Sequence, residues 1–254
     1  MRKFYLVLAV MVGLLAACAG NPVPPAEVAA SPTEASTLVP TATLEPTLVP
    51  TITLEPTPVP TEAPTATPDT RIPVVLTIDD GWNREAFDAM LDILAENDSH
   101  ATFFLVATAS RRLGPERLAR LVEEGHEIAY HSYNHDDLEV LQSWGTKEWS
   151  EDYGKWVAAM RDLLGPELYA QGVKPYARAP YGLFSFGFVQ MSEDKHLQWF
   201  GWDTDVHAIH RIPAQDGDVI LGHIRNSDLE VFRALLLDPS YRVVSLSEYL
   251  DRAP

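Results

Sequence analysis

The stretch IPVVLTIDDGWN, residues 72–83, joins the pattern of a buried strand to two adjacent acidic residues. Residues 72–78 are almost all apolar and largely β-branched, which is typical of a parallel strand covered on both faces. The strand then runs into Asp79, Asp80 and Gly81. Two carboxylates side by side at the end of a core strand repel each other and lose solvation. Their presence therefore indicates a function at this strand end.

Downstream of residue 73, short apolar runs alternate with amphipathic stretches such as REAFDAMLDILAEN, PERLARLVEEG and WVAAMRDLLG. The last two stretches each end on glycine, a common helix stop. Strands are predicted at residues 74–78, 101–106, 127–131, 175–178, 197–202, 219–221 and 242–244. Seven strands alternating with helices predict an α/β fold, either a barrel or a doubly wound sheet. The sequence contains no GxGxxG or Walker-type loop, which disfavours a nucleotide-binding sheet.

Charged and histidine-rich motifs fall at the carboxyl ends of these predicted strands. After the two aspartates of the first strand, HSYNH ends the third, RAPYG the fourth, WDTD the fifth and ILGH the sixth. Active sites of β/α barrels are built at the carboxyl ends of the strands. Packing alone does not explain polar residues confined to these ends, so they predict an active site.

His131 and His135 have the H-x-x-x-H spacing of a metal site, but the glutamate of HExxH is missing between them. A carboxylate from another strand end would supply the third ligand of a catalytic site with an open position. One of the two adjacent aspartates would then bind the metal, and the other, beside a cation, would stay ionised as a base. The alternative is two exposed loop histidines and a helix-capping aspartate.

Residues 73–254 strongly resemble, over nearly their whole length, the polysaccharide deacetylase (NodB-homology) family. The resemblance is carried by five motifs in this order: TIDDG, ATFF, EEGHEIAYHSYNH, RAPYG and VILGH. The resemblance implies a distorted (β/α) barrel of about seven strands. It also implies an enzyme that uses a divalent metal to remove N- or O-acetyl groups from chitin oligomers, peptidoglycan or xylan. Zinc is the expected metal, with cobalt, nickel and manganese as alternatives.

Individual roles follow from the resemblance at the matching positions. The implied metal triad is Asp80, His131 and His135. Asp79 resembles the catalytic base, and Arg178 the arginine that pairs with it. Tyr181 would give its backbone N–H to the oxyanion, and His223 resembles the acid that protonates the leaving group. Among the tryptophans, Trp82 is expected to face the substrate because it lies next to this site.

One motif departs from the family pattern. The family has D-x-x-D-W on the fifth strand, and its second aspartate hydrogen-bonds the acid histidine. In the corresponding DVHAI, Asp205 matches the first aspartate, but Ala208 and Ile209 replace the second aspartate and the tryptophan. His223 is therefore expected to lack its usual carboxylate partner. The candidate replacements are Asp203, Asp205 and His207.

The first seventy residues have a different character. Arg2 and Lys3 precede an apolar run too short to span a bilayer, which predicts a signal peptide over residues 1–17. LLAAC resembles a lipobox, with lipidated Cys18 followed by a Pro/Thr-rich disordered linker to residue 70 and the deacetylase domain over residues 71–254. The alternative is an ordinary secretory signal with a chance cysteine. Cys18 is the only cysteine, so no disulfide can form within the chain.

The formal charge is −17, of which residues 71–254 carry 30 acidic and 17 basic side chains. This balance argues against nucleic-acid partners and against direct attraction to anionic lipid. The leading prediction is a monomeric extracytoplasmic enzyme, anchored to the bacterial membrane through lipid on Cys18, that deacetylates a polysaccharide. Two alternatives remain open: a catalytically weak glycan-binding lipoprotein, and a hydrolase of a non-sugar amide.

Overall fold

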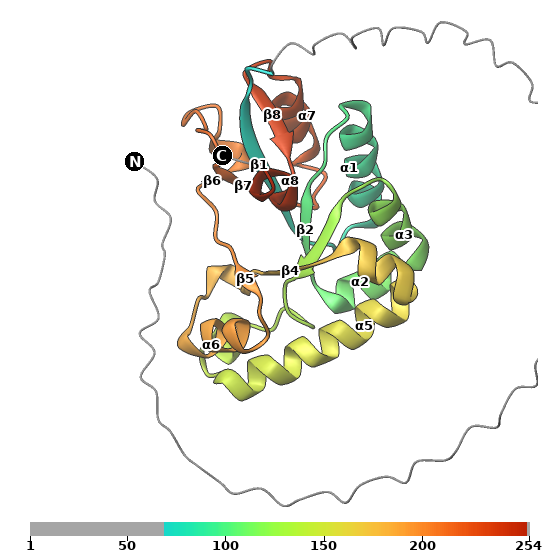
Figure 1. The fold of residues 1–254 in the computed structure, drawn as a ribbon, viewed down its shortest axis with the longest axis vertical. Helices are drawn as coiled ribbons and strands as arrows, with labels where there is room; N and C mark the ends of the chain where they lie inside the picture. Colours follow the sequence, from blue (N-terminus) through green and yellow to red (C-terminus); the bar gives the residue numbers. More distant parts are fainter. Residues whose placement is uncertain (1–68, 253–254) are drawn as a thin grey trace, which may run out of the picture. The chain divides into compact units, whose positions relative to one another are not determined.

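The computed structural model describes residues 69–252, which form an α/β fold around one eight-stranded parallel sheet (Figure 1). The strand order is β5-β4-β3-β2-β1-β7-β6, and β8 pairs with the first half of β1. The strands are β1 (Ile72–Asp80), β2 (Thr102–Leu105), β3 (Glu127–Tyr130), β4 (Val173–Ala177), β5 (Gln198–Trp199), β6 (Thr204–Asp205), β7 (Val219–His223) and β8 (Tyr241–Val244).

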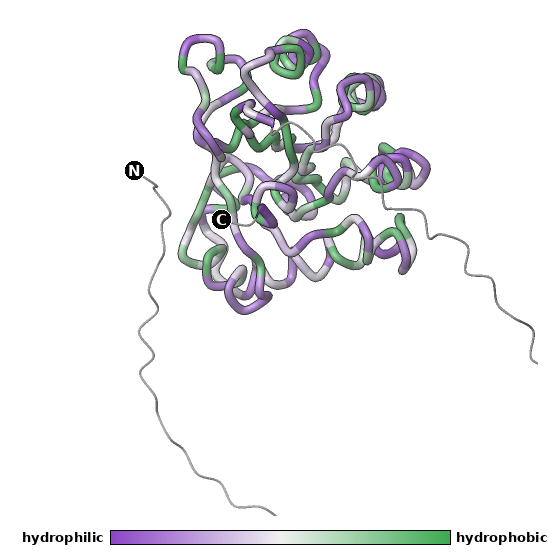
Figure 2. The backbone as a smooth tube through the Cα atoms, turned by 45° about the horizontal axis from the view of Figure 1, so that its top comes forward, coloured by the Kyte–Doolittle hydropathy of each residue, from purple (hydrophilic) through white to green (hydrophobic). Residues whose placement is uncertain are grey.

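The helices connect these strands and cover the sheet. They are α1 (Arg84–Glu96), α2 (Ala107–Leu113), α3 (Pro115–Glu123), α4 (Leu138–Gln142), α5 (Thr146–Gly172), α6 (Phe186–Asp194), α7 (Leu229–Leu237) and α8 (Leu246–Leu250), with 3₁₀ turns η1 (Pro180–Gly182) and η2 (Val206–Ala208). Along the helices, hydrophobic and hydrophilic residues alternate with the turns, as expected for helices with one face on a core (Figure 2).

Strand β1 is the centre of the sheet and is buried on both faces, as its sequence predicts. Val74, Leu76 and Ile78 belong to the main core with the helices, whereas Val75 belongs to a smaller cluster with Phe104 on the opposite face. Full burial of each such side chain contributes about 1.5–3 kcal/mol. Because β1 pairs with β2, β7 and β8, it fixes the strand ends on which the polar motifs lie.

The sheet curls into a distorted, incomplete barrel. Its two edge strands, β5 and β6, are consecutive in the chain and are joined by residues 200–203. Four residues can span roughly 13 Å, so this connection bridges the opening between the two edges. The barrel prediction is confirmed. The sequence pattern placed one strand at residues 197–202, whereas the structure has a two-residue strand on each edge.

Helix α5 lies against α2, α3 and α6. The sequence predicts a helix that ends at Gly165. In the structure Gly165, with φ 70°, and Pro166 interrupt α5, and helical geometry resumes after them. The predicted signal peptide, Cys18 and nearly all of the predicted linker lie outside the described residues. Within residues 69–252, no helix is both long enough and apolar enough to cross a membrane.

Candidate metal centre and active site

The end of β1 carries Asp79 and Asp80, and its backbone explains how both reach one pocket. In a regular strand, successive side chains point to opposite faces. Asp80 has φ 82° and Gly81 has φ 108°, so the chain leaves strand geometry at this point. A non-glycine residue in the left-handed region costs on the order of 1–3 kcal/mol and persists mainly at functional sites. Both carboxylates line the same pocket.

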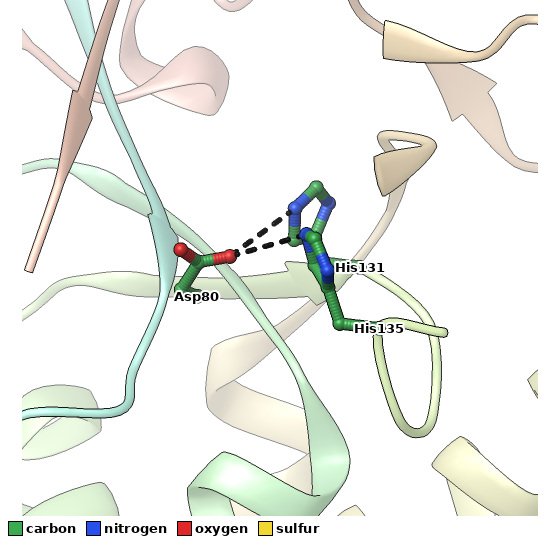
Figure 3. Close-up of side chains that lie close together, drawn as sticks. All are labelled: Asp80, His131 and His135. Carbon is green, nitrogen blue, oxygen red and sulfur yellow. Dashed lines mark ion pairs between the residues drawn. The ribbon is translucent and has the colours of Figure 1, made fainter. Parts of the chain in front are cut away.

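Asp80, His131 and His135 form a group that can hold a divalent metal ion (Figure 3). Asp80 Oδ1 lies 3.7 Å from His131 Nε2 and 3.5 Å from His135 Nε2. Ligand atoms of a tetrahedral zinc with bonds of about 2.0–2.1 Å are roughly 3.3 Å apart, so the three side chains fit such an ion with little movement. Two nitrogens and one oxygen leave a fourth position for a substrate or water.

The two histidines are oriented by their backbone surroundings. His131 Nδ1 donates a hydrogen bond to the backbone oxygen of Arg178 at 2.9 Å, which leaves Nε2 available to a metal ion. Burial lowers the pKa of His131, which favours the neutral, ligating imidazole. The backbone N–H of His135 donates to Ser132 Oγ at 2.9 Å, and both of these residues have positive φ. The tight loop thus turns His135 back toward His131.

Asp79 forms a buried ion pair with Arg178. Asp79 is 4 % exposed, and its Oδ1 accepts a hydrogen bond from Arg178 Nη1 at 2.8 Å. Arg178 is fully buried, and its other nitrogens donate to the backbone oxygens of Phe200 at 3.2 Å and Gly201 at 2.7 Å. The guanidinium therefore supplies the countercharge for Asp79 and also holds the segment that bridges the barrel opening.

His223 lies directly beside Asp79 across the parallel β1–β7 ladder, where the two residues are register partners. Cα atoms of neighbouring strands are about 4.8 Å apart, and residues in register point to the same face. The two side chains share a pocket of about 150 Å³. Its complete lining is Asp79, Asp80, His131, His135, Tyr181, Gly182, Trp202, Leu221, His223 and Arg225.

Two of the predicted substrate contacts lie in different places. Tyr181 lines the pocket, has φ 58°, and its ring meets the ring of His135 edge-on at 4.7 Å. Trp82 does not line the pocket, and the guanidinium of Arg112 lies over its ring at 5.1 Å. Trp202 lines the pocket instead and is 41 % exposed. Asp79 and Asp80, which are near Trp82 in the sequence, line the pocket, but Trp82 itself does not.

The three candidate partners for His223 have other polar partners. Asp205 accepts from the backbone N–H of His207 at 2.8 Å, and Asp203 accepts from the backbone N–H of Val219 at 2.9 Å. His207 Nε2 lies 3.3 Å from Asp228 Oδ1. None of the three makes a hydrogen bond to the His223 imidazole within the described part of the chain.

Asp228 is a buried carboxylate that the sequence analysis missed. It is 2 % exposed, and its Oδ2 accepts from the backbone N–H of His223 at 3.3 Å. Asp228 occupies the N-cap position of α7, where an aspartate ordinarily caps the helix, yet it makes no side-chain cap hydrogen bond. Its only signal in the sequence is its position five residues after His223.

Comparisons with known proteins agree with this geometry. A family model described as polysaccharide deacetylase matches residues 66–198. Chitooligosaccharide deacetylase of Sinorhizobium fredii is 31 % identical over 154 residues, which cover 60 % of this chain and 67 % of that protein. Peptidoglycan-N-acetylmuramic acid deacetylase PdaC of Bacillus subtilis is 37 % identical over 201 residues, which cover 72 % of this chain and 40 % of that protein.

A solved structure shows the same fold. A CE4 family pseudoenzyme from Bacillus anthracis matches with a TM-score of 0.60 at 22 % identity, over 72 % of this chain and 66 % of that one. The chain therefore spans about two thirds of one curated relative and less than half of the other.

Proposed function

Because the chain belongs to the polysaccharide deacetylase family, we propose that it is a metal-dependent hydrolase that removes acetyl groups from an N-acetylated amino-sugar polymer such as chitin or peptidoglycan. The observation that carries this proposal is one pocket lined by Asp79, by the Asp80/His131/His135 group and by His223, with Arg178 buried behind Asp79 and paired to it. The names of two relatives, a chitooligosaccharide deacetylase and a peptidoglycan deacetylase, support the substrate class.

Asp80, His131 and His135 would hold the metal, and zinc fits their two nitrogens and one oxygen best. When bound, the ion would polarise the acetyl carbonyl and lower the pKa of a water molecule. Asp79 would accept the proton of the attacking water, because its Oδ1 is held by Arg178 and its Oδ2 faces the ligand side, 3.6 Å from His131 Nε2.

His223 would donate a proton to the departing amine from the strand next to the base. A base and an acid at register-paired positions lie on the same side of the sheet, so one acetamide group can reach both. The backbone N–H of Tyr181 would stabilise the oxyanion, since its left-handed conformation presents η1 to the pocket. Trp202 would contact the sugar ring at the pocket rim.

Acetate release is the test of this proposal. Purified protein with its metal content measured would be incubated with N-acetylated chitooligosaccharides, peptidoglycan glycan strands and acetylated xylan. We expect acetate from an N-acetylated substrate, with loss of release after chelation and recovery on adding zinc. Release from xylan alone would show an O-deacetylase, and no release from any of the three with bound metal would overturn the proposal.

A second candidate is a protein that binds glycan without turnover. The observation that favours it is Ala208, at the position where the family has the aspartate that supports the acid histidine. A solved structure with the same fold is described as a pseudoenzyme. Binding of chitooligosaccharides by the metal-loaded protein, with no acetate released over days, would favour this candidate.

We also propose that the protein acts outside the cytoplasmic membrane, held there by lipid on Cys18. The lipobox-like LLAAC and the cell-wall substrates named for the relatives support this location. In detergent phase separation, the wild-type protein should enter the detergent phase and the Cys18→Ser variant the aqueous phase. Wild-type protein in the aqueous phase would contradict the anchor and leave the catalytic proposal intact.

A further inference from the structure

A second cavity, of about 450 Å³, lies beside the loop that carries His131 and His135 and is larger than the active-site pocket. Four carboxylates and two aromatic rings line it: Asp136, Glu148, Glu151, Asp152, Tyr133 and Trp144. Tyr133 and Asp136 belong to the chain segment that carries His131 and His135, and the other acidic residues come from α5. The cavity and the metal group are therefore built partly from the same loop.

Asp152 is the least exposed carboxylate of this cavity. It is 5 % exposed, and its Oδ1 accepts hydrogen bonds from the Tyr130 hydroxyl at 2.5 Å and the Tyr133 N–H at 2.9 Å. Within the described residues, no hydrogen bond reaches Oδ2, although Asp152 lines the cavity. Burial raises the pKa of Asp152 to about 6. A positively charged donor in the cavity would offset this loss of solvation.

The charge of the cavity favours a cationic ligand. The residues that line it include four carboxylates and one cationic side chain, that of Lys155. Asp136 and Glu148 each use one oxygen to accept from Asn134 and from the backbone N–H of Gly145, respectively. Glu151 is exposed, and within residues 69–252 its ion-pair contact is a long one, 3.8 Å to Lys147. The acidic side chains thus keep oxygens available for a ligand.

The arrangement does not favour a bare metal ion. Within the described residues, only Asp80, His131 and His135 bring ligand atoms within 4.8 Å of one another, so the cavity carboxylates are too widely spread to coordinate one ion. They suit a larger ligand that carries charge and hydroxyl groups at separate points. The half-buried rings of Tyr133 and Trp144 suit the apolar face of a sugar and a nearby cation.

We propose that this cavity binds a protonated amino sugar, that is, a glycan residue that has already lost its acetyl group. The inference rests on the proposed function, because N-deacetylation turns a neutral acetamide into a primary amine that can take up a proton and carry positive charge. The enzyme would then prefer partly deacetylated chains and would hold a product residue while acting on another acetylated residue of the same chain.

The test compares binding of two oligomers by isothermal titration calorimetry at low salt. The probes are a fully deacetylated glucosamine tetramer and the fully N-acetylated tetramer, and the metal-loaded Asp79→Asn protein prevents turnover. We expect Glu151→Gln to weaken binding of the glucosamine tetramer about fivefold, the scale of a partly exposed charge contact. Asp136→Asn should act in the same direction, and neither change should alter binding of the acetylated tetramer.

Glu167→Gln is the matched control. Glu167 is exposed, lies sixteen residues after Glu151 and beyond the interruption at Gly165, and does not line the cavity. We expect this variant to bind both oligomers like the parent protein. The cavity assignment would be overturned if the glucosamine tetramer bound Glu151→Gln, Asp136→Asn and the control with equal affinity. It would also be overturned if Glu167→Gln weakened binding of this tetramer as much as the two cavity variants do.

The outcomes separate this inference from the proposed function. Acetate release by the wild-type protein, together with unchanged binding by both cavity variants, would overturn the amino-sugar site alone. A different outcome would overturn the proposed hydrolase and support the amino-sugar site. In that outcome no substrate releases acetate, and Glu151→Gln selectively loses binding of the glucosamine tetramer.

Discussion

Asp79 and Asp80 are adjacent in the sequence but have different partners. Asp79 is bound by Arg178 at 2.8 Å, whereas Asp80 faces the two histidines at 3.5 and 3.7 Å. The positive φ of Asp80 makes this division possible, because it turns a second carboxylate to the same side as the first. The chemistry of each residue is therefore set by its neighbours rather than by its type.

Replacing Asp79 by asparagine should abolish hydrolysis while metal stays bound. The change removes a proton acceptor and keeps the shape, so we expect at least a ~10²-fold loss of kcat, the usual scale for a positioned proton-transfer group. Acetate release and elemental analysis of the same preparation would check this. Asp80→Asn is the paired variant and should lose metal. Near-normal turnover by Asp79→Asn would show that the two aspartates have the opposite roles.

Replacing Arg178 by methionine should destabilise the fold as well as the site. The change leaves the buried Asp79 charge without its partner and the backbone oxygens of Phe200 and Gly201 without their donor. Breaking a buried pair costs about 3–5 kcal/mol. Urea unfolding would measure this loss. The double variant with Asp79→Asn should be more stable than the Arg178→Met protein, and a purely additive result would contradict the ion-pair explanation.

At the scale of the elements, the sequence predicted the strands with continuous apolar runs but not the two-residue edge strands. Residues 74–78 and 219–221 are recognisable because they are buried on both faces, whereas β5 and β6 are defined only by the curl that brings them to opposite edges. The motifs at strand ends were placed correctly in one pocket because parallel strands end together.

The contacts made through loops could not be predicted in the same way. Asp228 reaches His223 because the turn after β7 folds back, and Asp152 reaches the loop after β3 from a helix about twenty residues farther along the chain. Neither contact follows a sequence period, since the first depends on the path of a turn and the second on how α5 packs. Trp82 illustrates the converse: it is adjacent to the aspartates in sequence, yet its side chain lies outside the pocket lining.

Gly222 is required by the packing of β7 against α7. A Cβ at this position would lie 2.1 Å from the Phe232 ring, so Gly222→Ala should destabilise the fold by about 1–3 kcal/mol and shift the neighbouring His223. Gly154→Ala is the control, because a Cβ there meets nothing within 4 Å and the position is helical. That change should stabilise by about 0.5–1 kcal/mol. Urea unfolding of both variants checks the contrast, and equal effects would contradict it.

At the scale of the whole molecule, two buried groups give stability opposite dependences on pH. Burial lowers the pKa of His126 to about 4, below its ordinary 6.5. Between these two pKa values the unfolded chain binds a proton at His126 and the folded protein does not, so stability falls as the pH falls. Burial raises the pKa of Asp152 from 3.8 to about 6. Here the folded protein takes up the proton first, so stability rises as the pH falls over a similar range.

Each shift corresponds to about 3 kcal/mol, so in the wild-type protein the two contributions largely offset each other between pH 6.5 and 4. Replacing one of the two residues should therefore reveal the pH dependence that the other gives to stability. Relative to the wild type, Asp152→Asn should lose stability as the pH falls through this range, and His126→Gln should gain it, each by an amount on the order of 3 kcal/mol. Free energies of unfolding in urea, measured on metal-free protein at pH 7, 5.5 and 4, would give both differences. The two difference curves must have opposite slopes, because the same burial that keeps a histidine neutral also keeps a carboxyl group neutral, and only one of these neutral forms has bound the proton.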